Sequence, residues 1–174
     1  MSIYRLLSIL LAGFCLYFGW ICAFRASESR KVPRAFWAGV VLGIPCLVWS
    51  AWHGCVMLEG PLSRFHPYVW GMVPISIVVV TLYVDYLFAR AAGGFFILAV
   101  NELIRQAFIW NTPCRPLYAL VCLVLGVVGM FLVGTPWRMR DVIDCCAQKP
   151  PVARGMGIVF ALFALVLVLL PLLS

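Results

Sequence analysis

Long runs of apolar residues, separated by short polar stretches, dominate the chain. The last run, from Ile158 to Leu173, contains no charged residue. A helix needs about 20 apolar residues to cross the hydrocarbon core of a bilayer. Runs of this length predict six spanning helices, which we place at about residues 3–24, 34–58, 67–86, 90–110, 117–133 and 155–173.

The length of these runs favours helices over a closed β-barrel. Backbone groups in hydrocarbon must be hydrogen-bonded within the protein, and only these two structures achieve this. Barrel strands are short and alternate apolar with polar side chains, whereas the runs here are unbroken. We therefore expect an all-α integral membrane protein, a bundle in which residues 1–174 form a single transmembrane domain.

The number of spans depends on the stretch of residues 67–110. This stretch is too long for one crossing and long enough for two. The turn between the two crossings would lie between Tyr86 and Gly94, a segment that also holds Arg90 and Gly93. If the turn does not form, residues 90–110 lie in the interface or re-enter the membrane, and the number of spans is five.

Composition supports a lipid environment. Hydrophobic residues make up 65% of the chain and charged residues 11%, and the mean hydropathy is +1.07. An ordinary soluble domain is about half apolar and about a quarter charged. Because a small soluble domain leaves much of its surface exposed to water, it has no means of hiding this much apolar surface.

The net charge of +7 predicts an orientation in the membrane rather than binding to nucleic acid. With six spans, one side holds nine basic residues: Arg25, Arg30, Lys31, Arg34, Arg90, Arg138, Arg140, Lys149 and Arg154. The other side holds four: Arg5, Arg64, Arg105 and Arg115. Because cytoplasmic loops are enriched in basic residues, we expect a multi-pass protein of a plasma membrane or bacterial inner membrane with both termini outside.

One polar cluster falls inside a predicted span: Asn101, Glu102, Arg105 and Gln106. Residues three and four apart are neighbours on a helix, so Glu102 is within reach of Arg105 and Gln106. Ionisable groups in a membrane are costly, usually paired and often functional. Two interpretations follow. The cluster faces the bundle interior and binds an ion or a polar headgroup, or Glu102 and Arg105 form an internal pair near the outer interface, where Arg105 snorkels.

The polar loop of residues 134–153 contains the second candidate site. Trp137, Arg138 and Arg140 suit contact with anionic lipid headgroups or with a partner protein. Asp141 and Asp144 are three residues apart, which fits either a cation site or a solvated helix face. We expect lipid, other membrane proteins or further copies of the chain as partners.

No metal or cofactor is expected. His53 and His66 flank the loop between the second and third spans, and their spacing matches no metal-binding motif. Their aromatic neighbours instead indicate an interfacial belt. The eight cysteines include no CxxC pair, so neither a zinc ribbon nor a thiol redox motif is indicated.

An arginine followed within a few residues by a glycine recurs at the start of three predicted helices. The pairs are Arg34 and Gly39, Arg90 and Gly93, and Arg154 and Gly157. A repeat of this kind suggests three helical hairpins, as in membrane transporters built from repeats. The simpler interpretation is that basic residues and glycines are common at these places in membrane helices.

The sequence contains no Walker motif, HExxH, GxSxG or dinucleotide-binding fingerprint. Three function classes remain: a non-enzymatic protein acting through partners or lipids, a small ion or solute transporter or channel, and a membrane-embedded enzyme acting on a lipid-soluble substrate. Transport generally needs several ionisable groups along a path, and Glu102 is the one acidic residue well inside a span. The first class is therefore favoured.

Overall fold

In the computed structural model, the described residues (3–25, 32, 35–110 and 114–172) contain helices and no strand. The helices are α1 (Ile3–Phe24), α2 (Phe36–Met57), the 3₁₀ helix η2 (Gly60–Phe65), α3 (His66–Tyr83), α4 (Leu87–Ile109), α5 (Arg115–Gly134), α6 (Trp137–Gln148) and α7 (Pro150–Leu172). Within this part of the chain, six helices are long and apolar enough to cross a membrane: α1 to α5 and α7. An all-helical chain with six such helices is confirmed.

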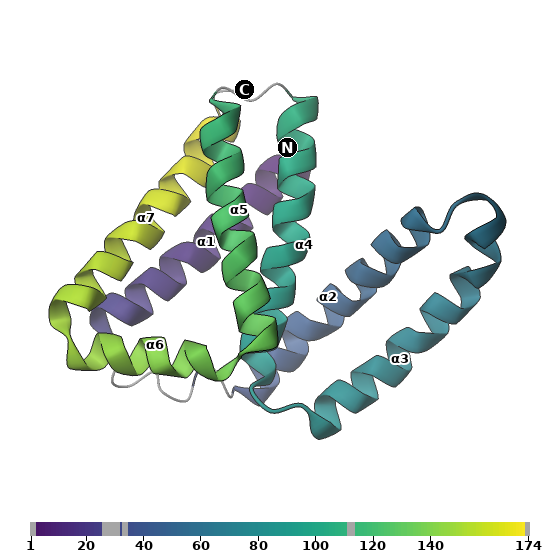
Figure 1. Ribbon diagram of the computed structural model, residues 1–174, viewed down its shortest axis with the longest axis horizontal. Helices are drawn as coiled ribbons and strands as arrows, with labels where there is room; N and C mark the ends of the chain where they lie inside the picture. Colours follow the sequence, from purple (N-terminus) through teal and green to yellow (C-terminus); the bar gives the residue numbers. More distant parts are fainter. Residues whose placement is uncertain (1–2, 26–31, 33–34, 111–113, 173–174) are drawn as a thin grey trace.

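The long helices form a four-helix body and an attached hairpin. Figure 1 shows α1, α4, α5 and α7 together, the α2–α3 hairpin leaning away from α4, and α6 lying across one end. The start of α1, the end of α4, the start of α5 and the end of α7 share the opposite end. α3 contributes no buried residue and packs on α2 and η2, so most of its surface is not covered by the described part of the chain.

The turn on which the number of spans depends is present, but it lies earlier than Arg90 and Gly93. α3 ends at Tyr83 and α4 begins at Leu87. Tyr86 makes the reversal by adopting a left-handed backbone conformation with φ 57°, which is uncommon for a residue other than glycine. Asp85 is exposed in this turn and forms no ion pair with Arg90.

The segment expected as a polar loop, residues 134–153, contains a helix. α6 has 12 residues, and its buried side chains are Met139, Ile143 and Cys146. These positions follow the i, i+4, i+7 spacing of one helix face, so α6 is amphipathic. The sequence analysis considered a short helix face only around Asp141 and Asp144, because α6 is too short and too polar to be recognised as a span.

Helix α4 is the most buried of the long helices, and α5, α2 and α1 pack against it. Phenylalanines fill the contact with α1, where the rings of Phe14 and Phe95 lie 5.0 Å apart between centroids. One polar contact joins α1 to α5: the hydroxyl groups of Ser8 and Tyr118 are hydrogen-bonded at 3.0 Å. Both side chains are buried, so each hydroxyl group has a hydrogen-bond partner where water is absent.

Glycines allow α4 and α5 to approach backbone to backbone. A Cβ atom built on Gly93 would lie 2.6 Å from the carbonyl oxygen of Gly129, and one on Gly129 would lie 2.8 Å from the oxygen of Gly93. In lipid no hydrophobic force drives helices together, so close packing of small residues contributes much of the association. Neither position has room for a side chain.

The other two glycines of the possible repeat also mark helix contacts. A Cβ on Gly39 would lie 2.7 Å from the backbone nitrogen of Phe88 in α4, and one on Gly157 would lie 3.1 Å from Cβ of Ala23 in α1. Arg34 lies outside the described residues. The extensive pairings besides α4–α5 are α1–α7 and α2–α4, which are not neighbours in sequence. The packing is therefore not one of three consecutive hairpins.

We predict that Gly93→Ala destabilises the fold by about 1–3 kcal/mol, because the new methyl group would collide with a backbone oxygen of α5. The measurement is the melting temperature of the purified protein in detergent. Gly94→Ala is the matched control, since a Cβ there has nothing within 4 Å and alanine favours a helix by about 1 kcal/mol over glycine. Equal melting temperatures for the two variants would contradict the predicted contact.

Candidate functional site

The predicted site residues lie in two places at opposite ends of the bundle. Asn101, Glu102, Arg105 and Gln106 belong to the second half of α4, and Trp137, Arg138 and Arg140 belong to α6. Figure 1 shows α6 at the end where α4 begins. The two groups are therefore separate sites.

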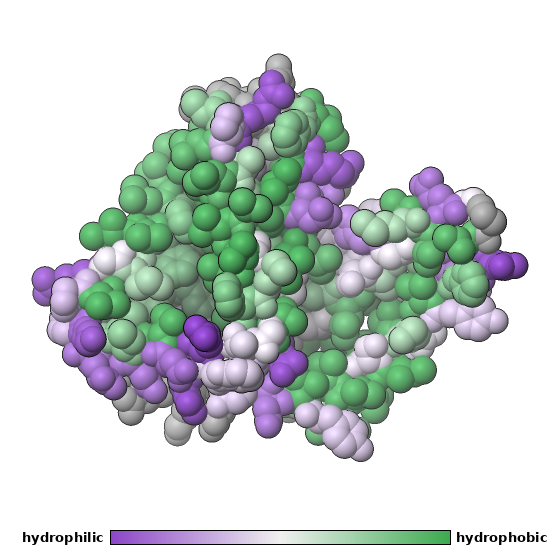
Figure 2. Space-filling model, viewed as in Figure 1, coloured by the Kyte–Doolittle hydropathy of each residue, from purple (hydrophilic) through white to green (hydrophobic). Residues whose placement is uncertain are grey.

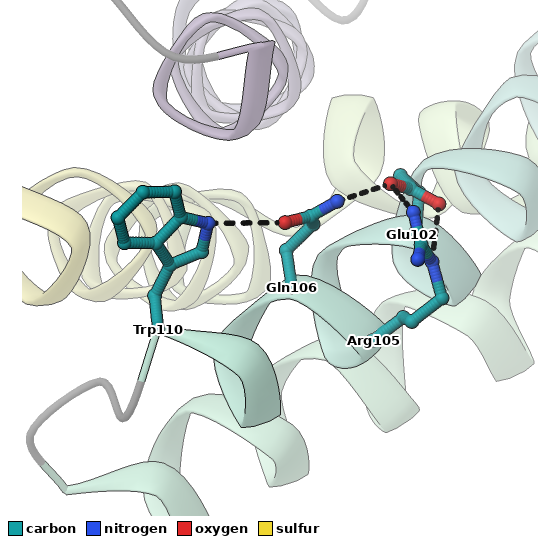
Figure 3. A network of polar contacts seen from close by, with 4 residues as sticks. All are labelled: Glu102, Arg105, Gln106 and Trp110. Atoms are coloured by element: carbon teal, nitrogen blue, oxygen red, sulfur yellow. Dashed lines mark hydrogen bonds and ion pairs between the residues drawn. The ribbon is translucent and has the colours of Figure 1, made fainter.

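The polar side chains of α4 form a network within the helix itself (Figure 3). Glu102 accepts hydrogen bonds from Arg105, with Nε to Oε2 at 3.0 Å and Nη2 to Oε1 at 2.6 Å. The side-chain amide of Gln106 donates to Oε1 of Glu102 at 2.7 Å and accepts from Nε1 of Trp110 at 3.1 Å. Each link joins residues three or four apart, which is the pairing that helix geometry predicts.

The network lies on the side of α4 away from its packed core. The guanidinium-bearing side chain of Arg105 is 60% exposed and that of Glu102 is 13% exposed, while Asn101 is exposed and makes no hydrogen bond to the described residues. The opposite face is buried and carries Phe96, Leu103 and Ala107. Figure 2 shows hydrophilic surface on the flank of α4 that faces the α2–α3 hairpin. The cluster thus does not point into the contact of α4 with α1 and α5, and Glu102 and Arg105 form a pair within α4.

His53 of α2 is a neighbour of this network that sequence reasoning did not identify. It lies close enough to Glu102 to act on that carboxylate electrostatically. Its Nε2 atom is buried and has no hydrogen-bond partner in the described part of the chain. Its ring packs against Trp49 and Trp52, with centroids 5.9 and 6.3 Å away. The aromatic surroundings were visible in the sequence, but the proximity to α4 depends on how α2 packs.

At the opposite end, α6 presents two different faces. The face toward the bundle is apolar, and the outer face exposes Trp137, Arg138 and Arg140. The helix begins directly after Pro136, a residue that helix starts tolerate well because its missing N–H would be unpaired there. A short helix with an apolar face, a tryptophan and a basic face is typical of helices that lie in the plane of a membrane interface.

The two arginines of α6 differ in their partners. Nη2 of Arg140 lies 3.2 Å from Oδ1 of Asp141, and this hydrogen bond raises the pKa of the Arg140 guanidinium. The side chain of Arg138 forms no hydrogen bond or ion pair with the described residues. Asp141 is thus engaged with a base, and no group of three or more potential ligands within the described ranges is placed to hold a metal ion.

An apolar cavity of about 280 Å³ lies beside α6. Its walls come from α1, α4, α5, α6 and α7 and include Phe18, Phe96, Phe131 and Phe160, while Arg138 supplies the charged side chain. Figure 2 shows a hollow between α5 and α7, above the hydrophilic band of α6. Its lining residues are scattered along the sequence and follow no motif, so no sequence signal pointed to it.

Two cysteines also meet at this end. Cys22 in α1 and Cys146 in α6 line the same small pocket. Burial raises the pKa of the Cys146 thiol, which makes it a poor nucleophile near neutral pH because the thiolate is the reactive form. The adjacent Cys145 is exposed.

We predict that Glu102→Ala destabilises the protein more than the double change Glu102→Gln, Arg105→Gln. The alanine removes the acceptor of both Arg105 and Gln106, whereas the double variant removes the charges together and keeps an amide acceptor. The measurement is the melting temperature in detergent for both variants. A double variant less stable than Glu102→Ala would show that the charges themselves, and not the unpaired donors, determine the effect.

Comparison with models of known protein families, with curated protein sequences and with solved structures gave no match. The function of this chain must therefore be inferred from its own geometry. The polar side chains of the α4 network bond to one another, while α6 exposes Trp137 and Arg138, borders an apolar cavity and leaves the side chain of Arg138 without a partner among the described residues. The α6 end is accordingly the stronger candidate for binding.

Proposed function

We propose that this chain is a non-enzymatic, multi-pass protein of a plasma membrane or bacterial inner membrane, and that α6 binds anionic lipid at the cytoplasmic surface. The observation that carries the proposal is the amphipathic α6, which lies across one end of six apolar helices. Its apolar face is covered by the bundle, and its Trp137, Arg138 and Arg140 side chains are exposed.

The distribution of charge supports this orientation. Among the described residues, the end that carries α6 holds Arg25, Arg90, Arg138, Arg140, Lys149 and Arg154. The opposite end holds Arg5, Arg64, Arg105 and Arg115. Arg30, Lys31 and Arg34 lie outside the described residues. Basic residues concentrate on the cytoplasmic side, where anionic lipids attract them. Both termini then lie outside.

The α4 network supports the same assignment. Trp110 and Arg105 mark the other end of the spans, where tryptophans and snorkelling arginines are common. Glu102 is already bound by Arg105 and Gln106. A carboxylate bound in this way fits a structural role in α4. It fits a transport path less well, because such a path generally uses several ionisable groups.

Two native cysteines allow the orientation to be tested. Cys114, at the start of α5, and Cys145, in α6, are exposed at opposite ends. We predict that a membrane-impermeant maleimide labels Cys114 in intact cells and labels Cys145 only after the membrane is opened. Cys114→Ser and Cys145→Ser identify the labelled site, and Cys146 reacts slowly because burial raises its pKa. Labelling of Cys145 before Cys114 in intact cells would refute the orientation.

The lipid-binding role is tested by removing the exposed charges of α6. We predict that Arg138→Gln, Arg140→Gln weakens the preference for phosphatidylglycerol over phosphatidylcholine by about fivefold per charge in mixed nanodiscs. The measurement is the lipid retained by the purified protein, counted by mass spectrometry.

The matched control removes two charges at the other end, by Arg5→Gln, Arg64→Gln. Arg64 lies over the ring of its own neighbour Phe65, 5.4 Å from the centroid, and that end of the bundle has no amphipathic helix comparable to α6. We expect a smaller loss of preference in this variant. An equal loss in the two double variants would show a general effect of net charge and refute a specific role for α6.

A further inference from the structure

The cavity beside α6 has the two chemical features of a site for an amphiphile. Its wall is apolar over nearly its whole extent and is built from five helices. One charged side chain, that of Arg138, lines it from α6. Figure 2 shows the hollow on the outer surface, between α5 and α7. In a membrane this opening faces lipid from the side, so a lipid can enter without crossing water.

The walls suit a flexible hydrocarbon chain. Phe131 and Val128 line the cavity from α5, and Met156 and Phe160 line it from α7. Methionine and phenylalanine offer an adaptable and a flat apolar surface, respectively. The volume of about 280 Å³ is near the lower limit of ordinary ligand pockets. It is therefore suited to one chain rather than to a whole lipid.

The charge at the cavity is available for a ligand. The side chain of Arg138 has no ion pair or hydrogen bond to the described residues, whereas the side chain of Arg140, two residues along, is paired with Asp141. Arginine binds phosphate well because its planar group donates two parallel hydrogen bonds. The apolar wall and the unpaired cation lie at the level of α6, which under the proposed function is the level of the lipid headgroups.

We propose that this cavity binds one acyl chain of an anionic phospholipid, whose phosphate is held by Arg138. The proposal rests on the proposed function and makes it specific, since it assigns a single bound lipid to a defined place on α6. The cationic side chain at the cavity favours a lipid with net negative charge over a zwitterionic one. The cationic group of a zwitterionic headgroup would be repelled by the basic residues at this end.

The test uses the full chain in phosphatidylcholine nanodiscs, with a phosphatidylglycerol probe that carries a photoactivatable group on one acyl chain. We expect cross-links on the cavity-lining residues of α5 and α7, about tenfold more than with the equivalent phosphatidylcholine probe. Arg138→Gln should abolish this difference, while Arg140→Gln should leave most of it. A cross-link map centred outside the cavity would overturn the proposal.

A second pair of variants tests the cavity itself. Val128→Trp fills it from α5, and Val124→Trp places the same side chain one turn away, at an exposed position that does not line it. We expect Val128→Trp to remove the cross-links and Val124→Trp to keep them, with both proteins purified as folded species. Equal cross-linking in the two variants would exclude the cavity as the binding place.

The outcomes separate the two proposals. If both arginines affect the preference for phosphatidylglycerol equally and Val128→Trp has no effect, α6 binds surface lipid and the cavity proposal is wrong. If neither arginine matters, both proposals are wrong. If the lining residues cross-link to another polypeptide rather than to the probe, the cavity is a protein interface and the lipid assignment is also overturned.

Discussion

The backbone contact between α4 and α5 is the constraint on which the arrangement depends. Surrounding lipid is as apolar as the helix surfaces, so exclusion from water does not hold spanning helices together. Close packing between helices stabilises them instead, and Gly93 and Gly129 allow the backbones of α4 and α5 to contact each other. α4 then serves as the common neighbour of α1, α2 and α5. It also has the largest buried share of the six long helices.

The other glycine contact explains the cavity. Gly19 and Gly157 allow α7 to pack closely on α1. A Cβ on Gly19 would lie 3.0 Å from Cβ of Phe160. With α5 bound to α4 and α7 bound to α1, α5 and α7 diverge toward one end (Figure 1). α6, whose 12 residues extend about 18 Å, joins their ends. The space left between these three helices, closed on its inner side by α1 and α4, is the cavity that Arg138 lines.

The polar side chains at the two ends of the bundle differ in whether they have partners within the protein. At the end of α4, Glu102, Arg105, Gln106 and Trp110 satisfy one another within a single helix. At the α6 end, the side chain of Arg138 has no hydrogen-bond or ion-pair partner in the described part of the chain and lies beside an apolar hollow. The first arrangement stabilises a helix end near an interface, and the second leaves binding capacity for an external group.

The sequence by itself determined what depends on neighbours along the chain. Unbroken apolar runs predict six long helices because a span needs about 20 apolar residues, and the i, i+3 spacing of Glu102 and Arg105 predicts their ion pair. Only the tertiary structure decided that α6 folds across the end of the bundle, that His53 lies beside Glu102, and that a cavity forms at Arg138. These features arise from which helices pack together, and that choice depends on contacts between residues far apart in sequence, such as Gly93 with Gly129 and Gly19 with Gly157.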